Sequence, residues 1–150
     1  MKIDIVDLEE NLQYLDQYIE LRNSFTDKLL CEKVTMQDTK EWIKNTQLCI
    51  KIATQNSLIL GVVILYMDKE NEITVFVKEQ NKGLGNLLLL EIEKFALDSK
   101  IKQIYAWIQN TNIASQSLFL KQKYIKQKQS TKIFNNIKYT GDIYQKELSI

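Results

Sequence analysis

Two glycines stand close together in a chain that contains only four of them. Gly83 and Gly85 lie in the segment QNKGLGN, residues 80–86, between a strand-like stretch and a long helix-like stretch. Glycine lets a backbone approach another group closely, and the unpaired N–H groups at the start of a helix attract phosphate. This turn is therefore a candidate site for a phosphate-bearing ligand.

Three phosphate-binding patterns compete for this turn, and two of them do not fit. A P-loop requires a lysine after its last glycine, where this chain has Asn86. A dinucleotide-binding turn requires a third glycine and a repeated strand–helix–strand unit, and this chain has Leu88 at the third position. The pattern that remains is Q-x-x-G-x-G, from Gln80 to Gly85, which presents a run of N–H groups suited to a pyrophosphate.

The absence of histidine limits the chemistry that the chain can perform. Without histidine, Ser–His and Cys–His nucleophiles and histidine metal sites are excluded, and we expect no metal. A general base must be Glu, Asp, Tyr, Lys, Cys or a water. Cys31 and Cys49 match no metal or redox spacing, so we expect two thiols in a reducing cytoplasm.

Charge and hydropathy argue against two kinds of partner. The chain carries 20 Lys and Arg against 19 Asp and Glu, a net charge of +1, so no basic surface for nucleic acid is indicated. The longest apolar stretch, residues 58–67, is too short to span a bilayer. Acidic residues near the start argue against a signal peptide. We therefore expect a cytoplasmic protein that binds neither nucleic acid nor membrane.

The elements that must position the turn follow from hydrophobic periodicity. Helical spacing predicts helices at residues 8–23 and 35–46, the second with Asp38 and Glu41 as a capping box. Strands are predicted at 48–54, 58–67 and 72–77, then a helix to about Ser99, a strand at 101–109, a short helix at 112–123 and two final strands within 124–148. Tight turns make the first strands antiparallel, and the long helix allows one parallel pair. The expected fold is α+β: one domain over residues 1–150, with a mixed, mostly antiparallel twisted sheet flanked by helices.

The turn and a later helix together resemble one enzyme family. Q-x-x-G-x-G between a strand and a helix resembles the acetyl-coenzyme A (acetyl-CoA) loop of the GCN5-related N-acetyltransferases, the GNAT family. The segment NIASQSLFLKQKY resembles that family's later motif, N-x-x-[AS]-x-x-[LF]-Y-x-K-x-G-F, matched at Asn112, Ser115, Leu118, Lys121 and, loosely, Tyr124. The predicted element order is also that of the family. The resemblance implies acetyl-CoA as co-substrate and direct transfer of its acetyl group to a primary amine.

A looser similarity concerns the acceptor of the acetyl group. The stretches ILGVVILYM and NEITVF are similar to the amino-sugar branch of the family, which acetylates a UDP-linked 4-amino sugar in pseudaminic acid synthesis. That similarity implies a nucleotide-linked amino sugar as the small-molecule amine, with a homodimer as a candidate assembly. Two alternatives stay open: acetylation of a protein N-terminus or lysine, and a non-catalytic sensor that binds acyl-CoA.

The resemblance also implies coenzyme contacts for particular residues. These are Val75, Val77, Gln80, Asn81, Lys82, Gly83, Leu84, Gly85, Asn86, Asn112, Ser115, Phe119 and Lys121. Within this set, Val75 and Val77 would pair with the pantetheine arm as an added strand does. Asn112 is equally a natural N-cap of the short helix, and Asn110 is the other candidate for both roles.

Catalytic and acceptor-binding residues are indicated less sharply. Glu72 begins the strand before the loop, where the resemblance to the amino-sugar branch implies a glutamate that handles the proton. Burial would raise its pKa and help it to accept one, and its alternative role is that of a surface acid. Phe119 stands where the family commonly has the tyrosine that protonates the leaving thiolate. Tyr124, another nearby tyrosine or water would replace it. Arg22 and Asn23 are expected on the acceptor side, with a solvated charge as the alternative for the arginine.

Overall fold

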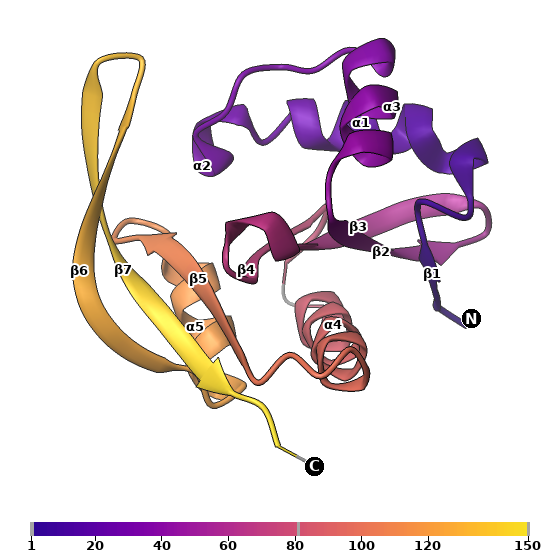
Figure 1. Cartoon of the computed structure of the whole chain (residues 1–150). Helices are drawn as coiled ribbons and strands as arrows, with labels where there is room; N and C mark the ends of the chain where they lie inside the picture. The colour runs from indigo at the N-terminus through magenta and orange to yellow at the C-terminus, as the bar shows by residue number, and fades with distance from the viewer. Residues whose placement is uncertain (1, 81, 150) are drawn as a thin grey trace.

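The computed structural model describes residues 2–80 and 82–149. In chain order the elements are β1 Asp4–Asp7, η1 Leu12–Tyr14, α1 Leu15–Asn23, α2 Thr26–Leu29, α3 Met36–Asn45, β2 Leu48–Gln55, β3 Leu58–Tyr66, η2 Met67–Lys69, β4 Glu72–Val77, α4 Leu84–Asp98, β5 Gln103–Gln109, α5 Ile113–Lys121, β6 Ile125–Phe134 and β7 Ile137–Glu147. The strands form one seven-stranded sheet in the order β1-β2-β3-β4-β5-β7-β6. All neighbouring strands are antiparallel except β4 and β5, which are parallel. The predicted α+β fold with a mixed sheet is therefore confirmed (Figure 1).

Alternation along the central strands gives the sheet two apolar faces, because successive side chains of a strand point to opposite sides. In β2, Ile50 and Ile52 join the core that contains the buried residues of α1. Cys49 and Ala53 join the core that contains the buried residues of α4. Figure 1 shows α1 and α3 on one side of the sheet and α4 on the other. At 15 residues, α4 is the longest of the described helices, and none of these is both long and apolar enough to cross a membrane.

The N-terminal segment differs most from the prediction. β1, which was not predicted, pairs with β2 and brings Asp4 opposite Thr54. Leu8 is fully buried, and its N–H donates to the Ile50 carbonyl at 2.9 Å. The first helical segment consequently begins at Leu12 rather than at residue 8. α2 was also missed, since its four residues are too few to produce a periodic pattern.

Two helix starts test the predicted caps. The second helix is capped by Thr35, whose hydroxyl accepts a hydrogen bond from the Asp38 N–H at 3.1 Å. The predicted capping box from Asp38 to Glu41 is therefore wrong, because Asp38 already lies within the first turn. α5 begins as predicted, with the Asn112 side chain accepting from the Ser115 N–H at 3.2 Å.

The sheet splits between β4 and β5. These parallel strands are paired only where Glu72 lies opposite Tyr105, and the Tyr105 N–H donates to the Asn71 carbonyl at 3.3 Å. Beyond that point the strands diverge toward their carboxyl ends. The loop before α4 follows one of these ends, and the turn before α5 follows the other. The split therefore opens between the two segments that carry the sequence motifs.

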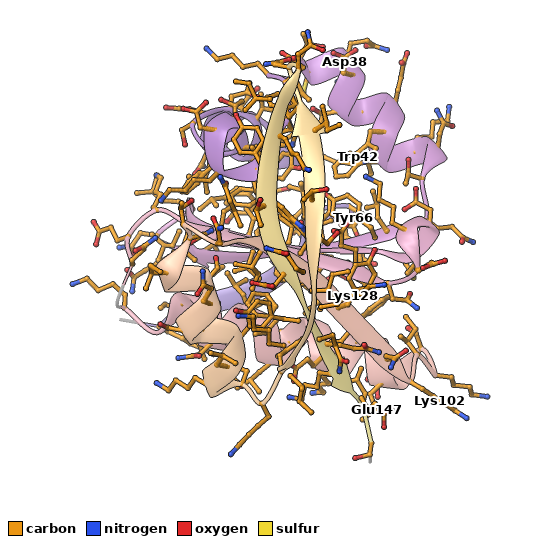
Figure 2. The ribbon with its side chains drawn as sticks, turned by 90° about the vertical axis from the view of Figure 1, so that its left-hand side faces the viewer. Asp38, Trp42, Tyr66, Lys102, Lys128 and Glu147 are labelled. Carbon is orange, nitrogen blue, oxygen red and sulfur yellow. The ribbon has the colours of Figure 1, made fainter. Side chains whose placement is uncertain are left out.

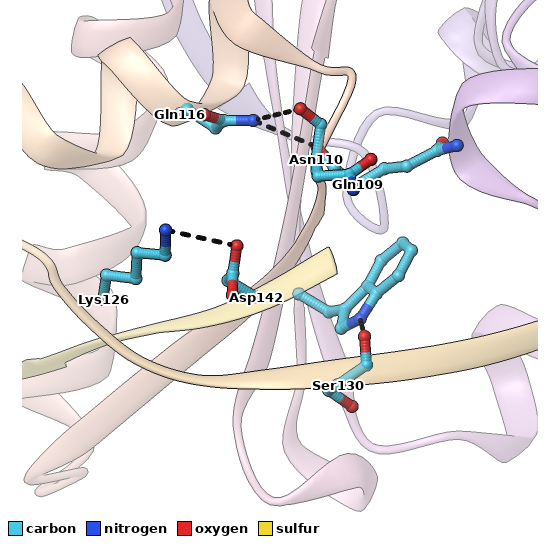
Figure 3. Close-up of polar contacts among 7 residues, drawn as sticks. Gln109, Asn110, Gln116, Lys126, Ser130 and Asp142 are labelled. Carbon is cyan, nitrogen blue, oxygen red and sulfur yellow. Dashed lines mark hydrogen bonds and ion pairs between the residues drawn. The ribbon is translucent and has the colours of Figure 1, made fainter. Parts of the chain in front are cut away.

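The β6–β7 hairpin stands at one side of the molecule, with its turn extending beyond the level of α2 (Figure 1), and it crosses in front of the other strands in Figure 2. Trp107 of β5 holds the hairpin in place, because the indole N–H donates to the Ser130 carbonyl of β6 at 3.2 Å. The indole reaches β6 across β7 at Gly141, where a Cβ would stand 2.7 Å from the ring. Figure 3 shows Ser130 together with the ion pair between Lys126 and Asp142, 3.5 Å apart, which joins the two strands of the hairpin.

Candidate active site

Gly83 ends the loop before α4 and serves as the N-cap of that helix. Its φ of 75° lies in the left-handed region, which glycine adopts without steric cost. The first hydrogen bond of the helix runs from the Leu87 N–H to the Gly83 carbonyl at 3.2 Å. The N–H groups that precede it have no partner within the helix, and together with the helix dipole they attract an anion.

Gly85 has a packing role besides the coenzyme contact predicted for it. A Cβ at this position would stand 2.9 Å from Cδ2 of Leu118 in α5, so its bare backbone lets α5 pack closely against α4. Asn86 strengthens this contact, because its Oδ1 accepts from the side-chain amide of Gln122 at 2.9 Å. Of the two glycines, only Gly83 has open space, with no protein atom within 4 Å of an added Cβ.

A cavity of about 530 Å³ lies between the loop before α4 and the start of α5. It is lined by most of the residues predicted to contact coenzyme, namely Val75, Val77, Gln80, Lys82, Gly83, Leu84, Gly85, Asn86, Asn112, Ser115 and Lys121. Phe119 is an exception, since it lines a neighbouring cavity, and Asn81 lies outside the described residues. The fold thus brings residues of β4, α4 and α5 around one space.

The backbone of β4 directs some of its N–H and C=O groups toward this cavity. The Lys78 N–H donates to the Leu60 carbonyl of β3 at 2.8 Å, whereas the Asn71 carbonyl accepts from β5. Because ladder bonds alternate along a strand, Val75 and Val77 direct their N–H and C=O groups away from β3 and into the split. An extended, amide-bearing chain could pair with them there.

A second cavity of about 250 Å³ lies on the face of the sheet that carries Glu72. The two cavities meet, since both are lined by Lys28, Leu29, Val75, Phe76, Asn112 and Ser115. α5 is fixed beside this junction by Gln116, whose amide donates to the Asn110 carbonyl at 2.9 Å and to the Gln109 carbonyl at 3.3 Å (Figure 3). A ligand in one cavity can therefore reach a ligand in the other through the split.

Glu72 lies at the closed end of the split. Its side chain is 14% exposed and lines the second cavity. The Oε2 atom lies 3.5 Å from Nζ of Lys132, which reaches it from β6. Tyr66 is directly opposite Glu72 in β3 and lines the same cavity. A carboxylate held there can receive a proton from a group bound in the cavity.

Comparison with known proteins identifies the family. The model of the acetyltransferase (GNAT) family matches residues 15–124, which include β4, α4, β5 and α5. The chain belongs to this family. The predicted enzyme class, an acyltransferase of the GNAT type, is thereby confirmed.

Individual relatives agree with this assignment. The curated L-2,4-diaminobutyric acid acetyltransferase of Halalkalibacterium halodurans is 27% identical over 107 residues, which cover 65% of this chain and 57% of the relative. The crystal structure of an N-acetyltransferase from Staphylococcus aureus Mu50 is similar with a TM-score of 0.86 and 17% identity, covering 99% of this chain and 100% of that one. The protein yncA from Salmonella typhimurium, solved with its cofactor acetyl-CoA, has a TM-score of 0.81 and 17% identity, covering 98% and 94%.

The two residues predicted to bind the acceptor have different surroundings in this acetyltransferase. Arg22 lines the second cavity, and its Nη1 donates to the Glu32 carbonyl at 3.2 Å. Asn23 is not among the residues that line either cavity. Its amide donates to the Val34 carbonyl at 3.0 Å and accepts from the Val34 N–H at 2.9 Å. Asn23 therefore holds the loop after α2 rather than presenting its amide to a ligand.

Tyr124, the predicted replacement for the missing proton donor, lies behind the site. Its ring packs edge-on against Phe119 with centroids 4.8 Å apart, and it lines neither cavity. The hydroxyl donates to Oε2 of Glu93 at 2.8 Å, and Lys146 reaches Oε1 of Glu93 at 2.9 Å. Burial, then the Glu93 charge, raises the pKa of the Tyr124 hydroxyl. This geometry directs the hydroxyl into the core, away from the split.

The acetyltransferase also places residues at the second cavity that sequence reasoning missed. They are Tyr66, Lys69, Trp107, Lys132 and the α2 residues Lys28 and Leu29. Burial raises the pKa of the Tyr66 hydroxyl to about 12. Trp107 and Lys132 come together only through the hairpin, so no local spacing could have predicted their contact. Within residues 2–80 and 82–149, no group of three or more His, Cys, Asp and Glu side chains is arranged to hold a metal.

Proposed function

We propose that this acetyltransferase binds acetyl-CoA in the larger cavity and transfers the acetyl group directly to a primary amine of a small molecule in the smaller one. The observation that carries this proposal is the junction of the two cavities at the split, where six residues line both. Direct transfer requires donor and acceptor to meet without an intermediate carrier. A split that opens on both sides meets that requirement.

The donor site matches the parts of a coenzyme A molecule. The start of α4 suits the pyrophosphate, and the inward-facing backbone of Val75 and Val77 suits the amide groups of the pantetheine arm. Lys82 and Lys121 line the same cavity and add positive charge for the phosphates. The similar protein yncA was solved with acetyl-CoA, which agrees with this assignment.

Glu72 would remove the proton of the acceptor ammonium. The neutral amine then forms a bond to the thioester carbonyl carbon, the bond from that carbon to sulfur breaks, and coenzyme A leaves as its thiolate. Phe119 has no proton to give. Tyr66 holds its proton with a pKa of about 12, well above the value of about 8.5 for a thiol. The attacking nitrogen loses a second proton as the amide forms, and this proton, carried through solvent, protonates the thiolate.

Two acceptors deserve direct comparison. A nucleotide-linked amino sugar follows from the sequence similarity, and a diamino acid follows from the relative that acetylates L-2,4-diaminobutyric acid. The acceptor cavity of about 250 Å³ is below the usual range of about 300–1,000 Å³ for ligand sites. It suits the diamino acid more readily than a complete nucleotide sugar.

The test combines calorimetric titration with acetyl-CoA and an assay of free thiol release. The panel contains L-2,4-diaminobutyrate, nucleotide-linked amino sugars, polyamines and peptides with free N-termini. We expect micromolar binding of acetyl-CoA and thiol release with a small amine. Thiol release with peptides alone would favour a protein acetyltransferase, and tight binding without any release would favour a sensor.

A further inference from the structure

The acceptor cavity carries an excess of positive charge. Among the described residues that line it, four are cationic, namely Arg22, Lys28, Lys69 and Lys132, whereas Glu72 is the one carboxylate. The whole chain, by contrast, is almost neutral at +1. An amine acceptor enters as an ammonium ion, so this surplus of positive charge repels an acceptor that has no negative group.

Lys132 is the best-defined of these cations. Its Nζ lies 4.7 Å from the centroid of the Trp107 ring and 3.5 Å from Oε2 of Glu72. The indole limits where the ammonium can move and favours its charge. With 45% of its side chain exposed, Lys132 forms only a weak pair with Glu72. It can therefore turn from Glu72 to an anion that enters the cavity.

Specific contacts between β5, β6 and β7 position Lys132 beside Trp107 and Glu72. Ser130 and Lys132 are two residues apart on β6 and so point to the same side of that strand. The hydrogen bond from Trp107 to the Ser130 carbonyl, 3.2 Å long, fixes β6 beside the indole on which Lys132 lies. Gly141 makes the contact possible, because any side chain there would collide with the indole. In a strand interior, glycine often marks such a close approach.

We propose that the acceptor is an amine that also bears an anionic oxygen group, a carboxylate or a phosphate, and that Lys132 on Trp107 binds this group. The proposal rests on the proposed function, since it concerns the acceptor of the same transfer. Lys132 on the hairpin and Glu72 on β4, whose charged atoms lie 3.5 Å apart, then bind two neighbouring groups of one molecule. Lys132 pairs with its anion, while Glu72 receives the proton from its ammonium.

Matched pairs of amines test the requirement for an anion. L-2,4-Diaminobutyrate and 1,3-diaminopropane differ only by a carboxylate, and glucosamine 6-phosphate and glucosamine differ only by a phosphate. We expect kcat/KM for the anion-bearing member of at least one pair to exceed that of the partner without the anionic group about tenfold or more. The pair that shows the difference identifies the source of the anion. Equal or better turnover of the members without the anionic group in both pairs would overturn the proposal.

Variants of Lys132 test the residue. Lys132→Gln should raise KM for the anion-bearing acceptor about tenfold and leave KM for acetyl-CoA and for the amine without an anionic group within about threefold. Lys132→Arg should retain the preference, because it keeps the charge. Lys128→Gln is the matched control, since Lys128 is an exposed lysine of the same strand that lines neither cavity. An equal rise in KM for both members of a pair in Lys132→Gln would refute the role of Lys132.

A binding measurement separates this inference from the proposed function. Trp42→Phe leaves Trp107 as the only tryptophan of a chain that has two. In that background, saturated with coenzyme A, the anion-bearing amine should change Trp107 fluorescence at lower concentration than its partner without the anionic group, and Lys132→Gln should abolish the difference. Such a preference without thiol release would uphold the anion site and reject the transfer reaction. No difference between the members of either pair would reject the anion site, whatever the thiol assay shows.

Discussion

Gly85 of α4 lies directly against Leu118 of α5, with room for no Cβ: such an atom would stand 2.9 Å from Cδ2 of Leu118. The contact sets the distance between the two helices whose first turns line the donor cavity. It therefore links the packing of the core to the shape of a binding site.

Gly85→Ala should weaken both stability and coenzyme binding. The added methyl group meets the end of the Leu118 side chain, which must move aside in the cavity that it lines. We therefore expect a cost near the lower end of the usual range of about 1–3 kcal/mol for overpacking. We expect a lower midpoint of urea unfolding and weaker acetyl-CoA binding by calorimetry. The double variant Gly85→Ala/Leu118→Ala should recover part of both losses, because it removes the collision. If Gly85→Ala bound coenzyme as the parent does, this contact would not shape the donor site.

Gly83→Asp should reduce acetyl-CoA affinity more than it reduces stability. The positive φ of residue 83 strains any side chain by about 1–2 kcal/mol, and a carboxylate at the start of α4 repels phosphate. We expect at least a tenfold loss of affinity by calorimetric titration. Gly83→Asn is the control, since asparagine tolerates this conformation and carries no charge. If the aspartate and asparagine variants bound acetyl-CoA with equal affinity, the pyrophosphate would not bind at the start of α4.

Glu72→Gln should slow the chemical step and spare donor binding. The amide cannot accept the proton of the ammonium, and general base catalysis contributes about 10²–10⁴-fold. We expect kcat to fall by at least about 10²-fold, with KM for acetyl-CoA within about threefold of the parent. A kcat near that of the parent would make Glu72 a surface acid that only pairs with Lys132.

Cys31 should report occupancy of the acceptor cavity. It is half-buried, lines that cavity, and burial raises the pKa of its thiol above 9.0. The thiolate fraction at pH 7 is therefore below that of a free cysteine, so alkylation by iodoacetamide should be slow and should accelerate as the pH rises past 9. Bound acceptor should protect Cys31. Cys49, buried and with its pKa raised to about 12, should stay unmodified in the folded protein, and its modification at the same rate would show global unfolding instead.

Tyr124→Phe should lower stability without abolishing turnover. The change removes the donor that satisfies the largely buried Glu93, which costs about 1–3 kcal/mol. We expect a lower unfolding midpoint and kcat within about threefold of the parent. A hundredfold loss of kcat at unchanged stability would show instead that Tyr124 takes part in catalysis.

The segment from β4 to α5 could be predicted from sequence because its signals are local. Each of these signals involves residues that are close in sequence: the alternation of residues 72–77, the turn at Gly83 and the cap at Asn112. Glu72 could be located for the same reason, since it begins a strand that precedes the loop. The packing of Gly85 against Leu118 was not predicted, because Leu118 belongs to another helix.

The acceptor side could not be predicted in the same way. Trp107 and Ser130 are 23 residues apart in sequence, and their contact depends on the absence of a side chain at Gly141 on a third strand. Asn23 has a side chain typical of a binding site, yet its hydrogen bonds go to the backbone of Val34. Such roles depend on how elements that are distant in sequence pack together, and neither composition nor periodicity predicts that packing.

The single pairing between β4 and β5 has a consequence for the lifetime of the protein. A sheet whose two central strands pair at a single point lacks hydrogen bonds that those strands could otherwise have made. A pantetheine arm bound in the split, as proposed, would restore some of these bonds and act as a temporary strand. At a hundred times its dissociation constant, such a ligand adds about 2.7 kcal/mol to the free energy of unfolding. The supply of acetyl-CoA would then govern how long each molecule resists proteolysis, as well as how fast it works.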